Sequence, residues 1–122
     1  MGALAVAAAA VVFLTGVAHS YLGERFVLVP LFTRRDLPEM LGSDLLTKRT
    51  LRFVWHLLTV AWWGLGVVIL QLANRANVPT LGATIAATAF ASASLAFIVS
   101  RGRHLGWVAF LAAAFLTWYA TR

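Results

Sequence analysis

The chain has 122 residues, of which 61% are hydrophobic and 11% charged, and its formal net charge is +6. Soluble domains are about half apolar and about a quarter charged, so a soluble fold could not cover this much apolar surface. The sequence therefore predicts an integral membrane protein with a single domain, residues 1–122. Because the chain has no cysteine, disulfides, iron–sulfur clusters, thiolate zinc sites and cysteine nucleophiles are excluded.

Four apolar stretches approach the length of about 20 residues that a helix needs to cross a bilayer. We predict an all-α membrane protein with four antiparallel transmembrane helices, near residues 3–22, 53–72, 80–99 and 105–120. A cytoplasmic or interfacial connection, about residues 24–52, joins the first two helices. The other two connections are short turns, so consecutive helices are expected to be antiparallel neighbours in a bundle.

Basic residues mark one side of the predicted membrane domain. The first and third connections carry Arg25, Arg34, Arg35, Lys48, Arg49, Arg52, Arg101 and Arg103, and the other side carries only Arg75 and Arg122. The positive-inside rule then places both termini on the outer, periplasmic side of a bacterial cytoplasmic (inner) membrane. Since these residues flank apolar spans, their expected partners are anionic lipid headgroups, and nucleic acid is not expected.

The long connection contains two signals for helix starts. Asp36, followed by Pro38, predicts the capped start of a short helix over residues 37–41, which Gly42 is expected to end. Ser43 is expected to cap a second helix that runs unbroken from Asp44 through the second span. The apolar residues after Glu24 predict an interfacial stretch or an extension of the first helix that ends near Pro30.

Small residues recur four apart in the third span, and a comparable run lies in the first span. The third-span residues are Gly82, Ala83, Ala86, Ala87, Ala89, Ala91, Ser92, Ala93 and Ala96. Such stripes let helix backbones approach closely in lipid. We interpret them as the interior of the bundle, with a face kept for a partner protein as the alternative.

Three histidines are the main candidates for ligand binding. Measured inward from the predicted cytoplasmic border, along the helix axes, His19, His56 and His104 lie roughly 7, 6 and 2 Å deep. Three helices therefore place them in one layer. Facing imidazoles are how helical proteins hold haem iron axially, and three of them suit zinc or copper. The alternative is that each histidine only hydrogen-bonds a neighbour or a lipid headgroup.

Polar residues at the ends of the first two helices suggest an ion pair. Glu24 follows Ser20 by one helical turn, and Arg52 stands at the matching border of the second span. We predict polar pairing of Ser20, Glu24 and Arg52, with proton binding or relay by Glu24 as the alternative. Serine hydrolysis is not expected, because His19 and Ser20 are sequence neighbours that point in different directions on a helix.

The tryptophans divide into two groups. Trp55, Trp107 and Trp118 fall near the predicted borders, as an aromatic belt requires. Trp62 and Trp63 fall about midway through the second span, where an indole N–H needs a partner. Packing within the bundle is one interpretation of this pair, and contact with a partner protein, a pigment or a quinone is the other.

The size and four-span layout look like those of the small multidrug resistance transporters. Their membrane-embedded glutamate in the first helix has no match here, which counts against that family. The motifs HSYLGER and RFVWHLLTVAWW resemble those of small, uncharacterised four-span bacterial integral membrane proteins. That resemblance covers about half of the chain and implies no activity, but it draws attention to His19, Ser20, Gly23, Glu24 and His56.

These observations support three hypotheses for function. The first is a non-catalytic accessory subunit of a larger bacterial membrane complex of respiratory or photosynthetic type, with other integral membrane subunits and lipids as partners. The second is a membrane redox protein that binds haem or a metal ion through His19, His56 and His104. The third is a separate helical protein that binds lipid or another small molecule.

Overall fold

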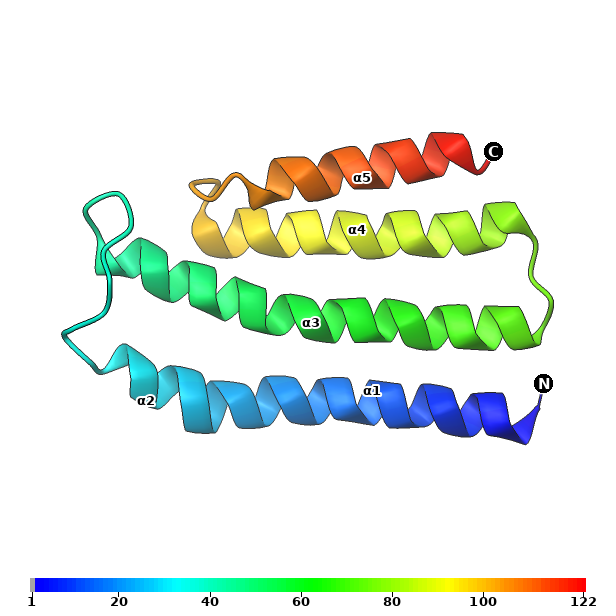
Figure 1. Ribbon diagram of the computed structural model, residues 1–122, viewed down its shortest axis with the longest axis horizontal. Coiled ribbons are helices and arrows are strands. Elements are labelled where there is room, and N and C mark those ends of the chain that lie inside the picture. Colours follow the sequence, from blue (N-terminus) through cyan, green and yellow to red (C-terminus); the bar gives the residue numbers. More distant parts are fainter. Residues whose placement is uncertain (1) are drawn as a thin grey trace.

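A computed structural model describes residues 2–122, and the fold is all-α (Figure 1). The elements are α1 (Ala3–Gly23), the π-helix η1 (Glu24–Leu28), α2 (Val29–Phe32), α3 (Asp44–Ala73), α4 (Val78–Ser100) and α5 (Gly106–Ala120). Met1, which the predicted domain includes, lies outside the described residues. Consecutive long helices run antiparallel, so the N- and C-termini lie at one end of the molecule, here called the terminal end. The opposite end carries the connections rich in arginine and is called the charged end.

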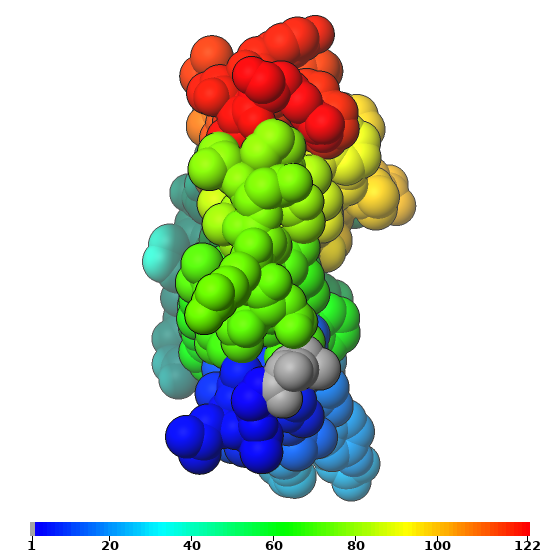
Figure 2. All heavy atoms as spheres, turned by 90° about the vertical axis from the view of Figure 1, so that its right-hand side faces the viewer, coloured from blue at the N-terminus to red at the C-terminus, as the bar shows by residue number. Residues whose placement is uncertain are grey.

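The long helices lie side by side in a row and do not close into the expected bundle. α1 packs on α3, α3 on α4, and α4 on α5, and within residues 2–122 no extensive contact joins α1 to α4 or α5. Figure 2 shows this row end on, as one column from α1 to α5. The helices therefore do not enclose a common interior, but the small residues Gly82, Ala86, Ser92, Ala93 and Ala96 of the third span are buried against neighbouring helices, as predicted. Because lipid covers apolar side chains as well as protein does, helices in a membrane need not close around a core.

Three helical segments are long and apolar enough to span a membrane: Ala3–Phe32, Asp44–Ala73 and Val78–Ser100. The fourth, α5, has 15 residues and is therefore about 22 Å long, less than the roughly 30 Å of a hydrocarbon core. The pair formed by α1 and α3 also extends beyond α4 at the charged end (Figure 1). The structure thus supports a multi-pass membrane protein with three full-length spans and a shorter one.

The first helix continues past the predicted end at Pro30 and stops at Phe32. A π-helical turn, Glu24–Leu28, precedes the proline, and the Val29 N–H donates to the carbonyl of Glu24 five residues earlier. A proline inside an α-helix lacks an N–H and its ring collides with the carbonyl four residues earlier, here that of Phe26. The wider π turn takes up this conflict, so the helix bends around Pro30 instead of ending there.

Residues 37–41 are not helical, contrary to the sequence-based prediction. Met40 and Ser43 pair through two backbone hydrogen bonds of 3.1 Å, and between them Leu41 and Gly42 both adopt positive φ, 52° and 76°. Asp36 does not cap a helix, because its carboxylate accepts two hydrogen bonds from Arg34. A segment of five residues is also too short to nucleate a helix alone.

The start of α3 is as predicted. The Ser43 side chain accepts a hydrogen bond from the Leu45 N–H at 3.2 Å, and the helix runs unbroken from Asp44 to Ala73.

In the connection that precedes α3, outside the membrane segments, the hydrogen bond from Arg34 lowers the pKa of Asp36. This connection is therefore an ordered link that returns the chain to the membrane beside α1.

α3 and α4 are in close contact at Gly64 and Thr88. A Cβ added to Gly64 would lie 2.7 Å from Thr88 Cγ2 and 3.0 Å from Thr88 Cβ. The buried face of α4 consists of small residues, Gly82, Ala86, Ser92, Ala93, Ala96 and Ser100. These residues let α4 approach both of its neighbours, as small-residue stripes do in lipid.

Replacing Gly64 by alanine should weaken this contact. The Thr88 side chain is stiff in a helix, so a methyl group at residue 64 must push the two backbones apart. The cost of overpacking exceeds the gain in helix propensity, so we expect the free energy of unfolding to fall by about 1–2 kcal/mol. Thermal unfolding in detergent measures this effect. Gly2→Ala, where a Cβ meets nothing within 4 Å, is the control, and equal midpoints for both variants would contradict the packing.

Candidate functional site

A chain of polar side chains connects α1 to α3 near the charged end. We call it the α1–α3 clamp. It consists of the side chains of Ser20, Glu24, Arg52, His56 and Thr59, and of the backbone carbonyl of Gly16. Residues one helical turn apart on each helix supply them, so the clamp follows directly from the 3.6-residue period. It covers roughly 10 Å of helix between Arg52 and Thr59.

Glu24 is the centre of the charged part of the clamp. Arg52 donates to its carboxylate twice, from Nη2 to Oε1 at 2.6 Å and from Nε to Oε2 at 3.2 Å. The His56 Nε2 lies 3.1 Å from Oε2. The Arg52 guanidinium also stacks over the Phe32 ring at 4.9 Å. One carboxylate on the first helix thus holds two basic side chains of α3, in an arrangement suited to a charge-assisted fork.

The inner part of the clamp is uncharged. Ser20 Oγ lies 2.8 Å from His56 Nδ1 and 2.7 Å from Thr59 Oγ1. The Thr59 hydroxyl donates to the Gly16 carbonyl at 3.1 Å, and its side chain is buried. The hydroxyls of Ser20 and Thr59 therefore each have a partner on the facing helix, which satisfies the strong demand for hydrogen bonds in a low-dielectric medium.

Counting protons shows how His56 sits between the two parts. Thr59 has one proton and gives it to Gly16, so Ser20 must donate to Thr59. The Ser20 oxygen then accepts from His56 Nδ1, while Nε2 faces the Glu24 carboxylate. The four contacts are His56 with Glu24, His56 with Ser20, Ser20 with Thr59, and Thr59 with the Gly16 carbonyl. Each of them carries a proton only when both ring nitrogens of His56 are protonated. A neutral His56 leaves the chain one hydrogen bond short.

His19 belongs to a separate contact beside the clamp. Its Nε2 lies 3.2 Å from the Trp55 carbonyl oxygen, and the Trp55 indole N–H donates to the His19 carbonyl at 3.1 Å. The two rings are stacked, with centroids 4.7 Å apart and planes 6° from parallel. Gly23 makes room for the Trp55 indole, because an added Cβ would collide with that ring.

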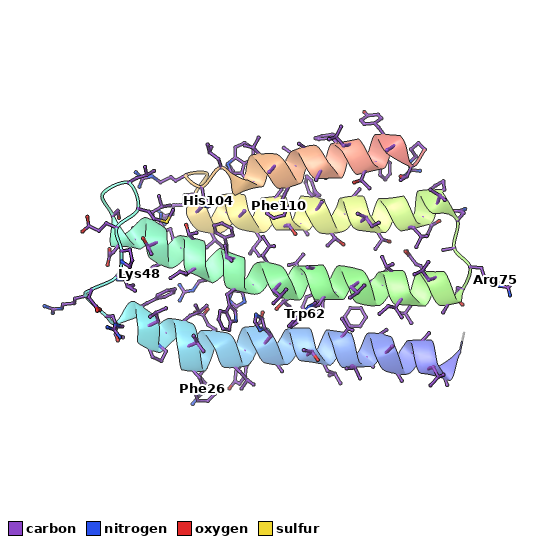
Figure 3. All side chains as sticks on the ribbon, in the orientation of Figure 1. Phe26, Lys48, Trp62, Arg75, His104 and Phe110 are labelled. Carbon is purple, nitrogen blue, oxygen red and sulfur yellow. The ribbon has the colours of Figure 1, made fainter. Side chains whose placement is uncertain are left out.

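The three histidines do not converge. His104 lies in the turn before α5 (Figure 3), where its ring packs edge-on against Phe53 of α3 at 5.0 Å and contacts neither of the other histidines. No group of three or more His, Asp or Glu side chains suited to a metal ion occurs among residues 2–122. Axial ligation of haem by His56 would also require release of Ser20 or Glu24. The geometry therefore gives no support to a ligand set of His19, His56 and His104.

The two central tryptophans have different roles. The Trp63 indole N–H donates to the Phe13 carbonyl at 3.3 Å, and this side chain is partly exposed. Trp62 packs edge-on against the His19 ring at 5.2 Å. Both therefore bridge α1 and α3, and Trp63 also leaves part of its surface open to a partner.

The order Ser20, His56, Glu24 repeats the order of groups that activates a serine nucleophile. Two features of the clamp oppose that chemistry. The Ser20 oxygen is already held by Thr59, and Ser20 lies inside α1, where backbone N–H groups are used by the helix and cannot stabilise an oxyanion. The chain of contacts also ends at the Gly16 carbonyl, which passes no proton onward. The clamp is therefore suited to fastening two helices together.

The polar residues of the clamp were predicted from the sequence, but two packing residues and one local feature of the backbone were not. Trp55 and Gly23 form the ring-over-glycine contact, and the π turn starts at Glu24. Only the spacing of Gly23 four residues after His19 hints at the first contact. The pairing of Glu24 with Arg52 follows from their positions at matching ends of antiparallel helices, and the structure brings them together.

The chain matches no protein-family model, curated protein or solved structure. The resemblance of its HSYLGER motif to small four-span bacterial membrane proteins therefore stays a prediction. The fold and the geometry of the clamp are the features of this protein that bear on its function.

Removing the charge of Glu24 should loosen the clamp. In Glu24→Gln, Arg52 and His56 lose their shared anion, at an expected cost of about 1–2 kcal/mol, because the group is partly exposed to solvent. Thermal unfolding in detergent at neutral pH measures the loss. Asp36→Asn removes a carboxylate that also accepts two bonds from one arginine but lies on the surface, so its midpoint should not change. Equal shifts for both variants would show that the clamp does not stabilise the fold.

Proposed function

We propose that this protein is a non-catalytic accessory subunit packed within a larger bacterial membrane complex, of respiratory or photosynthetic type. The observation that carries the proposal is the open row of helices. Among residues 2–122, each of the helices α1, α3, α4 and α5 makes its extensive contacts with its neighbours in the row, so both broad faces of the molecule are available to other subunits. A row of this kind is suited to lie against or between other membrane proteins.

Each broad face carries a groove between α3 and α4. One groove, of about 430 Å³, is bordered by Leu57, Ala61, Leu65 and Ala89. The other, of about 520 Å³, is bordered by Val60, Val67, Thr84, Ala87 and Ala91. Both reach Gly64 and Thr88, where the two helices are in close contact. Since the grooves use different sides of the same helices, they open on opposite faces of the row.

The lining of these grooves favours helices over lipid tails as partners. Small residues such as Ala87, Ala91 and Gly64 allow a second backbone to approach closely, and transmembrane helix interfaces are enriched in such residues. Ridges of a partner helix fit into grooves of this kind. Ala87 and Ala91 are both exposed and one helical turn apart, so they present a flat contact strip.

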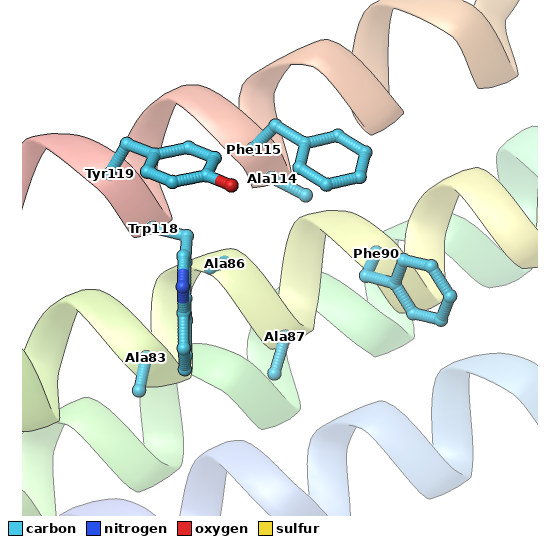
Figure 4. Close-up of a pocket in the computed structure, with 8 residues that line it drawn as sticks. All are labelled: Ala83, Ala86, Ala87, Phe90, Ala114, Phe115, Trp118 and Tyr119. Atoms are coloured by element: carbon cyan, nitrogen blue, oxygen red, sulfur yellow. The ribbon is translucent and has the colours of Figure 1, made fainter.

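A further groove, of about 330 Å³, lies between α4 and α5 near the terminal end (Figure 4). Trp118 reaches from α5 toward Ala83 on α4, and Phe115 and Phe90 lie farther along. Its walls combine alanines of α4 and α5 with the aromatic side chains of Phe90, Phe115, Trp118 and Tyr119. This groove is suited to the acyl chains of membrane lipids at the edge of the row.

The clamp supports a structural role as well. Glu24, the acidic side chain nearest to the membrane interior, is fully engaged with Arg52 and His56. Ion-coupled transport needs an acid that binds and releases a proton or cation during each cycle. A carboxylate fixed by two basic groups is better suited to hold α1 against α3 while the outer faces contact partners.

The distribution of arginine supports an orientation. The connection after the first helix and the turn after α4 lie at the charged end (Figure 1), and together they hold most of the basic residues. We place this end in the cytoplasm and both termini in the periplasm, following the positive-inside rule. The bacterial inner membrane is the membrane that this rule describes.

Mild detergent extraction followed by native gel electrophoresis tests the proposal. We expect the protein to migrate with a much larger complex. The double variant Ala87→Leu/Ala91→Leu places two bulky side chains in the groove, and we expect at least half of the protein to leave that complex. Leu116→Phe, which enlarges a lipid-facing side chain that is 72% exposed, is the control and should stay bound.

Two outcomes would count against the proposal, the first against the accessory role itself and the second against the α3–α4 groove as the contact surface. One is free migration of the wild-type protein as a monomer or small oligomer in several mild detergents. The other is full retention of the double variant in the large complex, provided that its thermal unfolding matches that of the wild type. The second outcome would assign the contact to another face of the row.

A further inference from the structure

A groove beside the clamp has the features of a small-molecule site. It lies on the α1–α3 pair near the charged end, has a volume of about 400 Å³, and is bordered by Thr15, His19, Phe26, Trp55 and Trp62, among others. We call it the His19 groove. Sites for small ligands are typically apolar clefts of about 300–1,000 Å³ with a few fixed polar groups.

The polar side chains that line this groove are those of Thr15, His19, Trp55 and Trp62, and the contact with the Trp55 carbonyl fixes the orientation of the His19 ring. The Trp55 carbonyl only accepts hydrogen bonds, so the nearby Nε2 of His19 carries the proton. In the neutral ring, Nδ1 is then an acceptor. Nδ1 has no hydrogen-bond partner among residues 2–122, and it is not one of the fully buried unpaired atoms. A backbone carbonyl that fixes the tautomer in this way holds the other nitrogen ready for a ligand.

The walls of the groove are flat and aromatic. The His19 ring lies parallel to the Trp55 indole at 4.7 Å, and Trp62 meets it edge-on at 5.2 Å. Phe26 is 62% exposed at the rim, and its position at the outer side of the α1–α3 pair is visible in Figure 3. The lining includes no Asp, Glu, Lys or Arg, and the Arg25 guanidinium lies outside it, 5.7 Å from the centre of the Phe26 ring at the rim. The chemistry suits a planar ring with a hydroxyl group and an apolar tail.

We propose that the His19 groove binds the head group of an isoprenoid quinol, with a ring hydroxyl donating to His19 Nδ1. The aromatic walls match the flat ring, and the groove lies near the membrane border on a surface that faces lipid. Because Nδ1 accepts, the reduced quinol binds more tightly than the quinone, which has only carbonyl oxygens. The proposal concerns binding alone and does not depend on the accessory role.

Fluorescence titration tests this site. The protein in phosphatidylcholine nanodiscs is titrated anaerobically with decylubiquinol, whose binding beside Trp55 and Trp62 should give saturable quenching. In His19→Phe the ring is kept and Nδ1 is lost, so we expect about tenfold weaker binding, the effect of one hydrogen bond. His104→Phe, a histidine outside the groove, is the matched control and should bind as the wild type does.

A second variant keeps the test decisive if His19→Phe unfolds. Ala18→Phe fills the exposed side of the groove without touching the contact between His19 and Trp55, and it should abolish saturable quenching. Decylubiquinone should bind more weakly than the quinol to the wild type. Quenching that never saturates, or that is unchanged in both groove variants, would overturn the proposal. Comigration with a larger complex is measured separately, so failure here leaves the accessory role standing.

Discussion

The contact between Glu24 and α3 is the interaction on which the arrangement of the first two spans depends. In lipid, apolar side chains give helices little reason to prefer one neighbour over another, so directional polar contacts decide the register and rotation of a pair. Here a carboxylate fixed by Arg52 and His56 sets the register at the charged end. The hydroxyls of Ser20 and Thr59 then extend that register toward the membrane interior. The π turn at Glu24 lets the first helix keep this alignment and still continue past Pro30.

Different interactions hold the α1–α3 pair and the three helices α3, α4 and α5. α1 and α3 are joined by a chain of hydrogen bonds and ring contacts. α3, α4 and α5 are joined mainly by the close approach of small residues such as Gly64, Gly82 and Ala96, with one side-chain hydrogen bond from Gln71 to Thr84 between α3 and α4. Neither mechanism draws α5 back toward α1. The result is a layer with two free faces, and this property connects the fold to the proposed role as a subunit between other membrane proteins.

Much of the fold could be predicted from hydropathy, because apolar runs of about 20 residues have few alternatives to a membrane span. The cap at Ser43 and the pairing of Glu24 with Arg52 were also within reach, since local chemistry and matching helix ends determine them. The short helix at residues 37–41 was predicted wrongly, because Asp36 prefers Arg34 as a partner. The closed bundle was wrong because helices that are apolar all round carry no signal for closure. The separation of His19 from His56 depends on the rotation of each helix, which the sequence does not specify.

The distance between the two edges of the row tests this account most directly. The chain has no native cysteine, so Val11→Cys on α1 and Leu116→Cys on α5, both exposed positions, can carry spin labels for pulsed dipolar spectroscopy. Three neighbouring helix spacings place the two axes about 24–30 Å apart, and we expect the main distance in that range or above it. A main distance near the roughly 10 Å of two packed helices would mean that the helices close into a bundle, and it would contradict the open row.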